Sequence, residues 1–259
     1  NNKYEVLAHK MERLLKENGV KDINISAAGG PCLAKNLANK AHTSVVFANN
    51  NIKVAEKISK LFKIPLKIIV IKEDINQVSK DVCDLIKKYN ISNKIRIQIL
   101  YPFPHMLKEV KEKIILTGLS ADTLYGTNYH SKIHLLEDFS KSRKEAIIED
   151  EIDGYSILKD LVENFEKKLI APYRNEEVIN YFLRHSWNEL NEPIQKQHSV
   201  EAFKDYFNQS SIYRKSSSLT INAKIRDLHN NLLKSSLNQL NRESIEELYS
   251  DILHERIKE

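Results

Sequence analysis

The stretch Asp22-Ile23-Asn24-Ile25-Ser26-Ala27-Ala28-Gly29-Gly30-Pro31 decides the predicted fold. Its β-branched residues predict a short strand over 22–26. Two glycines and a proline end that strand, and a helical pattern follows over about 32–39. The chain therefore runs from a strand through a tight glycine turn into a helix.

Working outward through the first half, strand and helix patterns alternate. The expected strands are 22–26, 44–47, 66–71 and 113–117. The expected helices are 3–18, 32–39, 52–62, 76–88 and 102–111. Strands that are separated by helices pair in parallel through right-handed crossovers. The first half is therefore predicted to be a doubly wound α/β sheet.

From about residue 132 the pattern changes to helix after helix. Segments 178–183, 200–207 and 219–233 fit the 3.6-residue period, with breaks near Gly154 and Ala171-Pro172. We therefore expect an α/β domain over 1–131 and a helical region over 132–259 that packs on the ends of the sheet.

Composition restricts the class of protein. The 259 residues include 41% hydrophobic and 29% charged side chains, which is typical of a soluble globular protein and not of a disordered chain. The longest apolar runs, such as 68–71, are far shorter than the roughly 20 residues that span a bilayer. No hydrophobic signal segment opens the chain. Two cysteines cannot build a disulfide framework or a four-thiolate zinc site. We expect a cytoplasmic protein without a membrane partner.

A small basic excess, 40 basic against 35 acidic residues, raises the question of a nucleic-acid partner. The lysines alternate with glutamates, as in Lys53–Lys57, and this pattern is more typical of solvated helix faces. A nucleic-acid partner is therefore disfavoured, although it stays open. The oligomeric state also stays open, a homodimer included.

Ligands of open parallel sheets bind beyond the carboxyl ends of the strands. The loop Ser26–Pro31 lies at such an end, and Gly29 and Gly30 let its backbone approach a ligand closely. The helix that begins near Cys32 offers free N–H groups, which suit phosphate or pyrophosphate. The alternative is a simple tight turn. The two standard nucleotide motifs, G-x-G-x-x-G and G-x-x-x-x-G-K-[ST], are absent.

A second loop, Leu116–Gly126, follows the last expected strand of the first half. Asp122 lies in this small-residue turn, and a carboxylate there is a candidate Mg²⁺ ligand. The alternative is that Asp122 only caps the next helix through its side chain.

Together the two loops resemble the synthetase domain of asparagine synthase, within the ATP-pyrophosphatase superfamily. Ala28–Leu33 is similar to the family's S-G-G-x-D-S loop, and Thr117–Gly126 to its S-G-x-G-A-D-E-L-F-G-G loop. Three further segments follow the family's order: 47–51 (G-F-E-N), 171–178 (V-P-F-L-D-x-E-V) and 193–196, which is similar to the segment with the catalytic lysine.

The resemblance implies a fold, a reaction and a set of site residues. The fold is ATP-pyrophosphatase-like, and the reaction uses ATP and Mg²⁺ to adenylate a small-molecule carboxylate, which an amine or ammonia converts to an amide. Lys196 and Asp122 are the implied catalytic residues, and Asp122 also holds the metal. The implied nucleotide-binding residues are Ser26, Ala28, Gly29, Gly30, Cys32, Phe47, Thr117 and Gly118. Since no glutaminase module is recognised, ammonia would be free, come from a substrate amine, or come from a separate glutaminase subunit.

Several positions depart from the family pattern. Ala28 and Leu33 replace serines, Cys32 replaces an aspartate that binds magnesium, and Thr123 and Asn175 replace acidic residues. These changes favour two alternatives to a working ligase. One is a catalytically degenerate, nucleotide-binding pseudoenzyme or regulatory protein.

The other alternative is an ATP-pyrophosphatase that modifies tRNA or another nucleic-acid base. Cys32 would then act as a thiolate at a helix N-terminus, although a structural cysteine is the simpler interpretation. His130 and His134 have the i,i+4 spacing of a zinc pair, but no third ligand lies near them in the sequence.

Overall fold

The structure is a computed structural model, and it describes only part of the chain. The described residues are 25–28, 44–46, 56, 59–60, 65–71, 74–127, 138–148, 154–204, 220 and 224–255. Several predictions lie outside them: the helices 3–18 and 32–39, Gly29, Gly30, Cys32, Leu33, Phe47, His130 and His134.

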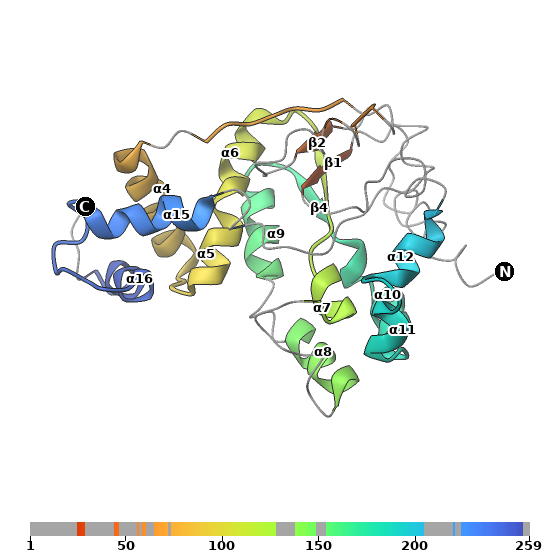
Figure 1. Cartoon of the computed structure of the whole chain (residues 1–259). Helices are drawn as coiled ribbons and strands as arrows, with labels where there is room; N and C mark the ends of the chain where they lie inside the picture. The colour runs from red at the N-terminus through yellow and green to blue at the C-terminus, as the bar shows by residue number, and fades with distance from the viewer. Residues whose placement is uncertain are drawn as a thin grey trace.

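A four-stranded parallel sheet lies between the helices (Figure 1). Its strand order is β2 (Ser44–Val46), β1 (Ile25–Ala28), β3 (Ile114–Thr117) and β4 (Lys168–Ile170). All three strand pairs are parallel, which confirms the predicted parallel pairing. Strands were expected close to the positions of β1, β2 and β3. β1 and β3 pair in register, with Ala28 opposite Thr117.

The expected strand at 66–71 is wrong. Only Leu66 forms an isolated bridge, and 67–71 have no regular structure. Ile69 and Ile71 pack partly against the core, whereas Ile68 is 47% exposed and Val70 is 82% exposed. Strand propensity depends on a neighbouring strand and a covering layer, so a β-branched run does not form a strand by itself.

The second half of the chain also contributes a strand, contrary to the helix-after-helix prediction. β4 pairs with β3, with Leu169 opposite Ile115. The sheet therefore draws strands from both sides of the expected boundary at residue 131, and the described protein is mixed α/β. The three residues of β4 are too few to show a period, so the pattern of the sequence does not predict this strand.

Helices make up most of the described chain. Their bounds are α4 (Ile75–Tyr89), α5 (Lys94–Leu100), α6 (Pro102–Glu109), α7 (Ala121–Tyr125), α8 (Phe139–Ile148), α9 (Tyr155–Glu163), η2 (Pro172–Arg174), α10 (Glu176–Leu183), α11 (Trp187–Asn191), α12 (Gln197–Ala202), α15 (Ile225–Asn230), η3 (Asn231–Lys234) and α16 (Ile245–Leu253). The predicted helices at 76–88, 102–111 and 178–183 are confirmed as α4, α6 and α10. α5 was not expected, α12 begins before the predicted 200, and α15 and η3 occupy part of 219–233.

α4 shows how local sequence sets a helix. The Asp74 carboxylate accepts hydrogen bonds from the N–H groups of Asn76 and Gln77, which would otherwise lack partners at the helix start. Asn90 ends the helix in the left-handed region, with φ of 51°. Val78, Val82, Leu85 and Ile86 are buried along one stripe.

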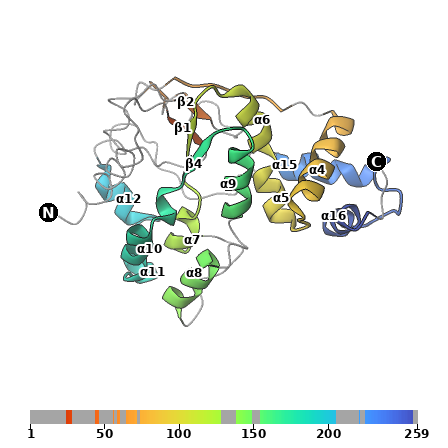
Figure 2. The ribbon, with the colours of Figure 1, turned by 180° about the vertical axis from the view of Figure 1, so that it is seen from behind.

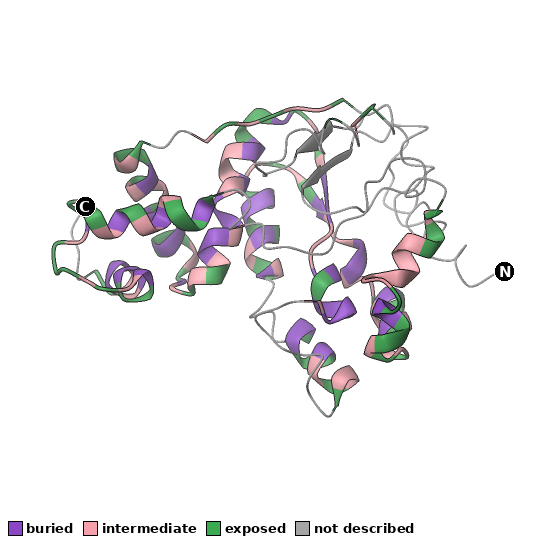
Figure 3. Ribbon diagram, viewed as in Figure 1, coloured by how far each residue is buried: buried purple, intermediate pink, exposed green. Residues whose placement is uncertain are grey.

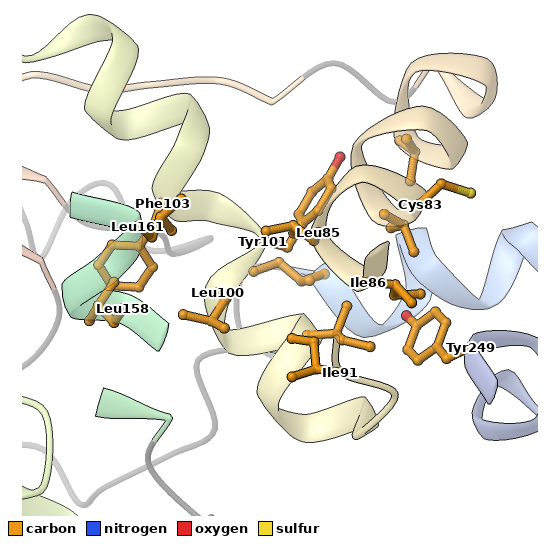
Figure 4. Packing of buried hydrophobic residues seen from close by; sticks show 14 of the residues in the cluster. Cys83, Leu85, Ile86, Ile91, Leu100, Tyr101, Phe103, Leu158, Leu161 and Tyr249 are labelled. Carbon is orange, nitrogen blue, oxygen red and sulfur yellow. The ribbon is translucent and has the colours of Figure 1, made fainter. Parts of the chain in front are cut away.

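The buried residues form two clusters. The larger cluster joins α4, α5, α6 and α9 to α15 and α16 from the end of the chain, and Figure 4 shows part of it. Leu100, Leu158 and Tyr249 are among its fully buried members. This core therefore ties the first half of the chain to its last helices.

The smaller cluster lies under α7, α8, α10 and α11. Its members are Ala121, Leu124, Tyr125, Ile147, Tyr173, Val178, Phe182 and Leu190. In opposite views, α4, α5, α15 and α16 gather at one end of the molecule, and α8, α10, α11 and α12 lie away from them (Figures 1 and 2). α7 and α10 contain buried residues, whereas α12 has none (Figure 3). In the described part of the chain, no helix combines the length and apolarity needed to cross a bilayer.

Candidate functional site

The loop after β3 places Asp122 beyond the carboxyl end of that strand. Thr117 Oγ1 accepts a hydrogen bond from the Leu119 N–H at 3.2 Å and turns the chain out of the strand. Ser120 follows with a φ of 70° and precedes α7. Asp122 therefore lies in the first turn of α7, where the helix dipole favours a negative charge. The alternative that Asp122 is the N-cap is wrong, because Ser120 holds that position.

The Asp122 carboxylate is paired with a distant lysine. Lys196 Nζ lies 2.6 Å from Asp122 Oδ1, and Thr127 Oγ1 donates to the same oxygen at 2.9 Å. The side chain of Asp122 is 53% exposed, but that of Lys196 is only 19% exposed. Two residues that the resemblance named from separate segments therefore meet at the end of β3.

α7 ends in a way that returns Thr127 to Asp122. The N–H groups of Gly126 and Thr127 donate to the carbonyls of Thr123 and Asp122, which is the Schellman pattern. Gly126 has a φ of 66°, and a Cβ there would lie 2.5 Å from Phe139 Cε2. Both the positive φ and the close ring favour glycine at this turn.

Lys196 reaches the site from the turn between α11 and α12. Its backbone is left-handed, with φ of 61° and ψ of 40°, and its N–H donates to Asn191 Oδ1 at 3.1 Å. The Lys196 ammonium lies over the ring of Tyr125, with Nζ 5.8 Å from the ring centroid, which is a cation–π contact. The Tyr125 hydroxyl is 2.7 Å from Ser199 Oγ on α12.

Arg143 holds the helices beneath the site together. Its side chain is fully buried, and Nη1 donates to the carbonyls of Leu124 and Phe182 at 2.6 and 3.1 Å. Nη2 donates to the His185 carbonyl at 3.0 Å. Carbonyls at helix C-termini carry partial negative charge, so they solvate the cation. Burial lowers the pKa of Arg143 to about 10, which leaves it charged at neutral pH.

Arg174 connects the segment 171–178 to the loop after β3. Its Nε donates to Ser120 Oγ at 2.7 Å, and its Nη1 donates to the Ile147 carbonyl. The guanidinium also lies 4.9 Å from the centroid of the Tyr155 ring. Two of the segments that carry the family resemblance therefore touch.

Two histidines meet near the site: His198 on α12 and His185 just after α10. The rings of His185 and His198 meet edge to face with centroids 4.8 Å apart, and His198 Nδ1 is 3.1 Å from the Tyr181 hydroxyl. Burial, and secondarily the nearby His185, lower the pKa of His198. The described residues contain no group of three His, Cys, Asp or Glu side chains that could hold a metal ion.

The predicted site residues are brought together in part. Thr117, Gly118, Asp122 and Lys196 lie around the carboxyl end of β3, and the backbone of Ser26 and Ala28 belongs to the adjacent strand β1. Because β1 and β3 are parallel and in register, the chain leaves Ala28 and Thr117 at the same edge of the sheet. The other predicted residues, Gly29, Gly30, Cys32 and Phe47, lie outside the described residues.

The predicted site residues fit a Mg²⁺ ion only together with ligands from a bound substrate. Asp122 is the single carboxylate of the predicted set, and its Oδ1 already receives Lys196 and Thr127. Magnesium is commonly bound by one or two carboxylates together with substrate phosphates. The residues therefore fit Mg²⁺ that arrives on a nucleotide better than a free ion.

Four residues that organise the site were missed by sequence reasoning: Tyr125, Arg143, Arg174 and Asn191. Their contacts are mostly to backbone carbonyls far away in the chain. Such contacts leave no periodic or motif signal. The only hint was the position of Tyr125 and Arg174 inside segments that carried the resemblance.

No protein-family model and no curated protein sequence matches this chain. The geometry around Asp122 and Lys196 is therefore the basis for a functional proposal.

Proposed function

We propose that this protein is an ATP-dependent, adenylate-forming amide ligase that resembles the synthetase domain of asparagine synthase. The observation that carries the proposal is the 2.6 Å contact between Lys196 Nζ and Asp122 Oδ1. The pair lies at the carboxyl end of a parallel strand, where ligands bind. Its cation suits the negative phosphate oxygens of a magnesium-bound phosphate chain, and its anion suits the Mg²⁺ ion.

The proposal includes a doubly wound, ATP-pyrophosphatase-like sheet. The strand order supports it, since the chain passes from β1 to β2 on one side and continues with β3 and β4 on the other. Ligands of such sheets bind where the order reverses, which here is between β1 and β3. Ala28 and Thr117 end these two strands side by side.

Lys196 and Asp122 would then exchange partners when the nucleotide binds. The ammonium of Lys196 would move from the carboxylate to the phosphates and offset the charge that builds up on the leaving pyrophosphate. Asp122, released from Lys196 and still bonded to Thr127, would hold Mg²⁺. The ion, when bound, neutralises charge on the phosphate oxygens. In the absence of ligand the pair keeps both charges compensated.

ATP–pyrophosphate exchange tests the adenylation step. The protein is incubated with ATP, Mg²⁺, labelled pyrophosphate and a panel of small carboxylic acids, with and without ammonium. We expect exchange that depends on one carboxylate, and amide formation only when ammonia or an amine is present. Lys196→Gln should lower the exchange rate by about 100-fold or more, because it removes the charge at the phosphates.

Lys204→Gln is the matched control, since Lys204 is exposed and lies just beyond α12. It should exchange at the wild-type rate. A panel that yields no exchange, with no change in nucleotide binding upon Lys196→Gln, would rule out the ligase.

A second candidate is a nucleotide-binding protein without catalysis. The observation that favours it is the departure of Ala28, Cys32 and Thr123 from the family pattern, combined with a single carboxylate that already pairs with Lys196. Calorimetry separates the two candidates. Tight ATP binding that does not change when Mg²⁺ is removed, without exchange, would select the non-catalytic protein.

A further inference from the structure

Asn191 makes hydrogen bonds to both halves of the site. It is the last residue of α11 and only 5% exposed. Its Nδ2 donates to the Tyr125 carbonyl at 2.7 Å and to the Trp187 carbonyl at 3.1 Å. Its Oδ1 accepts the Lys196 N–H at 3.1 Å.

These bonds connect the backbones that carry the two charged side chains. Tyr125 is the last residue of α7, the short helix on which Asp122 lies. Lys196 immediately precedes α12 in a left-handed conformation, which is costly for a residue with a Cβ and must be held by its surroundings. The amide of Asn191 therefore links the backbone that carries the Asp122 carboxylate to the backbone that carries the Lys196 ammonium.

α12 has little apolar packing that could hold it in place without the Asn191 amide. α12 has no buried residue. Among the described contacts of α12 are the polar pairs of Ser199 with Tyr125 and His198 with Tyr181, and the ring contact of His198 with His185. The Asp122–Lys196 pair lies just before its first residue. The bond from Asn191 to the Tyr125 carbonyl is buried, whereas the bonds of Ser199 and His198 are partly buried, so the Asn191 bond loses least to competition from water.

We propose that Asn191 is a positioning residue that sets the Lys196 ammonium against the Asp122 carboxylate. For the reaction, this role rests on the proposed function; for the geometry of the pair, it does not. Asparagine suits the role because one amide supplies two donors and an acceptor. Aspartate would keep the acceptor for Lys196 but present oxygen to the Tyr125 and Trp187 carbonyls. Leucine would keep the volume and lose all three bonds.

Double-mutant cycles on the full chain test this role without any ligand. Asp122→Asn, Lys196→Gln and the double variant are unfolded with urea, first with Asn191 and then in the Asn191→Leu background. With Asn191 present, we expect the pair to couple about two- to five-fold in the unfolding equilibrium constant. In the Asn191→Leu background the coupling should fall to about one-fold, because the two charges no longer meet.

A purely structural role predicts a different result. Asn191→Leu would then lower stability while the coupling between Asp122 and Lys196 stayed unchanged, and the proposal would be wrong. Asn188→Leu is the control, since Asn188 is exposed on the same helix, and it should leave the coupling intact. If Asn191→Leu does not fold, Asn191→Asp repeats the cycle, with the same loss of coupling expected and its retention again overturning the proposal.

Calorimetry with MgATP then separates this inference from the proposed function. Asn191→Leu should weaken MgATP binding about tenfold if the pair receives the phosphates. Wild-type protein that binds no MgATP, combined with coupling that is lost in Asn191→Leu, would reject the ligase and keep the positioning role. Unchanged coupling together with normal MgATP binding in Asn191→Leu would reject the positioning role and keep the ligase.

Discussion

The larger apolar cluster joins helices from distant parts of the chain mainly through aliphatic side chains, whereas the smaller cluster surrounds a buried guanidinium. His229 contacts the larger cluster and Arg143 lies beside the smaller one, and both are fully buried, but burial affects their charge differently. Burial lowers the pKa of His229, which contacts Tyr101 and Tyr249 of the larger cluster, to about 3, so this histidine is neutral at neutral pH. Arg143 stays charged because helix carbonyls replace its water.

The two clusters differ in how they relate to the candidate site. The larger cluster includes none of the predicted site residues, and its nonpolar contacts have no strict orientation. The smaller cluster includes Tyr125, which Asn191 and Ser199 tie to the turn that carries Lys196. Hydrogen bonds are directional, so they suit the part of the molecule where two charges must meet.

Arg143→Met should destabilise the protein by about 3–5 kcal/mol, because it leaves buried helix carbonyls without donors. Urea unfolding followed by circular dichroism measures the change. Lys144→Met on the same helix is exposed and should change stability by less than about 0.5 kcal/mol. A loss below about 1 kcal/mol for Arg143→Met would mean that the guanidinium does not organise the smaller cluster.

Gly126→Ala should cost about 2–4 kcal/mol, since it adds left-handed strain to a clash with Phe139. Gly154→Ala provides the comparison. Gly154 has a similar φ of 61°, but its nearest contact is a flexible arginine carbon at 3.1 Å, so about 1–2 kcal/mol is expected. Thermal unfolding of both variants measures the difference. Equal losses would show that the packing around Phe139 yields easily.

Acid should destabilise the larger cluster through His229. Its pKa is about 3 in the folded state, against an ordinary 6.5 when unfolded, so the unfolded chain binds the extra proton between these values. Above pH 6.5, protonation of His229 does not lower the free energy of unfolding. As the pH drops from 6.5 toward 3, the free energy of unfolding falls by up to about 1.4 kcal/mol per pH unit. Urea unfolding at several pH values gives the free energy of unfolding as a function of pH, and this free energy should change less with pH in His229→Gln than in the wild type. His254→Gln, at an exposed histidine, should keep the wild-type slope.

Tyr125→Phe should cost only about 0.5–1.5 kcal/mol, because it removes one partly buried hydrogen bond to Ser199. Ser199→Ala removes the same bond from the other side, and the double variant should cost little more than either single change. Urea unfolding gives all three values. Additive losses would show that the two hydroxyls do not act as a pair.

Sequence patterns predicted much of the fold where a local signal was strong. α4 has a capping aspartate, a clear apolar stripe and an asparagine end, and it was expected within one residue at each end. β3 and β2 were expected at nearly their observed positions. The segment 66–71 failed although its β-branched pattern was the longest, because strand formation requires a partner that sequence does not name.

The candidate site divides in the same way. Asp122 and Lys196 could be named because the residues around each resemble a known motif, and the structure brings them within 2.6 Å. Asn191 and Arg143 could not be named, since each is a single polar residue in an ordinary helix. Their roles come from carbonyls contributed by other segments.

The bounds of α4, α6 and α10, and the charged residues in motif-like turns, could be found from the amino-acid sequence, since these features depend on near neighbours in the chain. Tertiary structure alone decided that β4 joins β3, that Lys196 meets Asp122, and that a buried cation is solvated by helix ends. These contacts depend on how segments pack after they form, and backbone carbonyls are present at every residue. A sequence therefore cannot show which of them a buried side chain will bind.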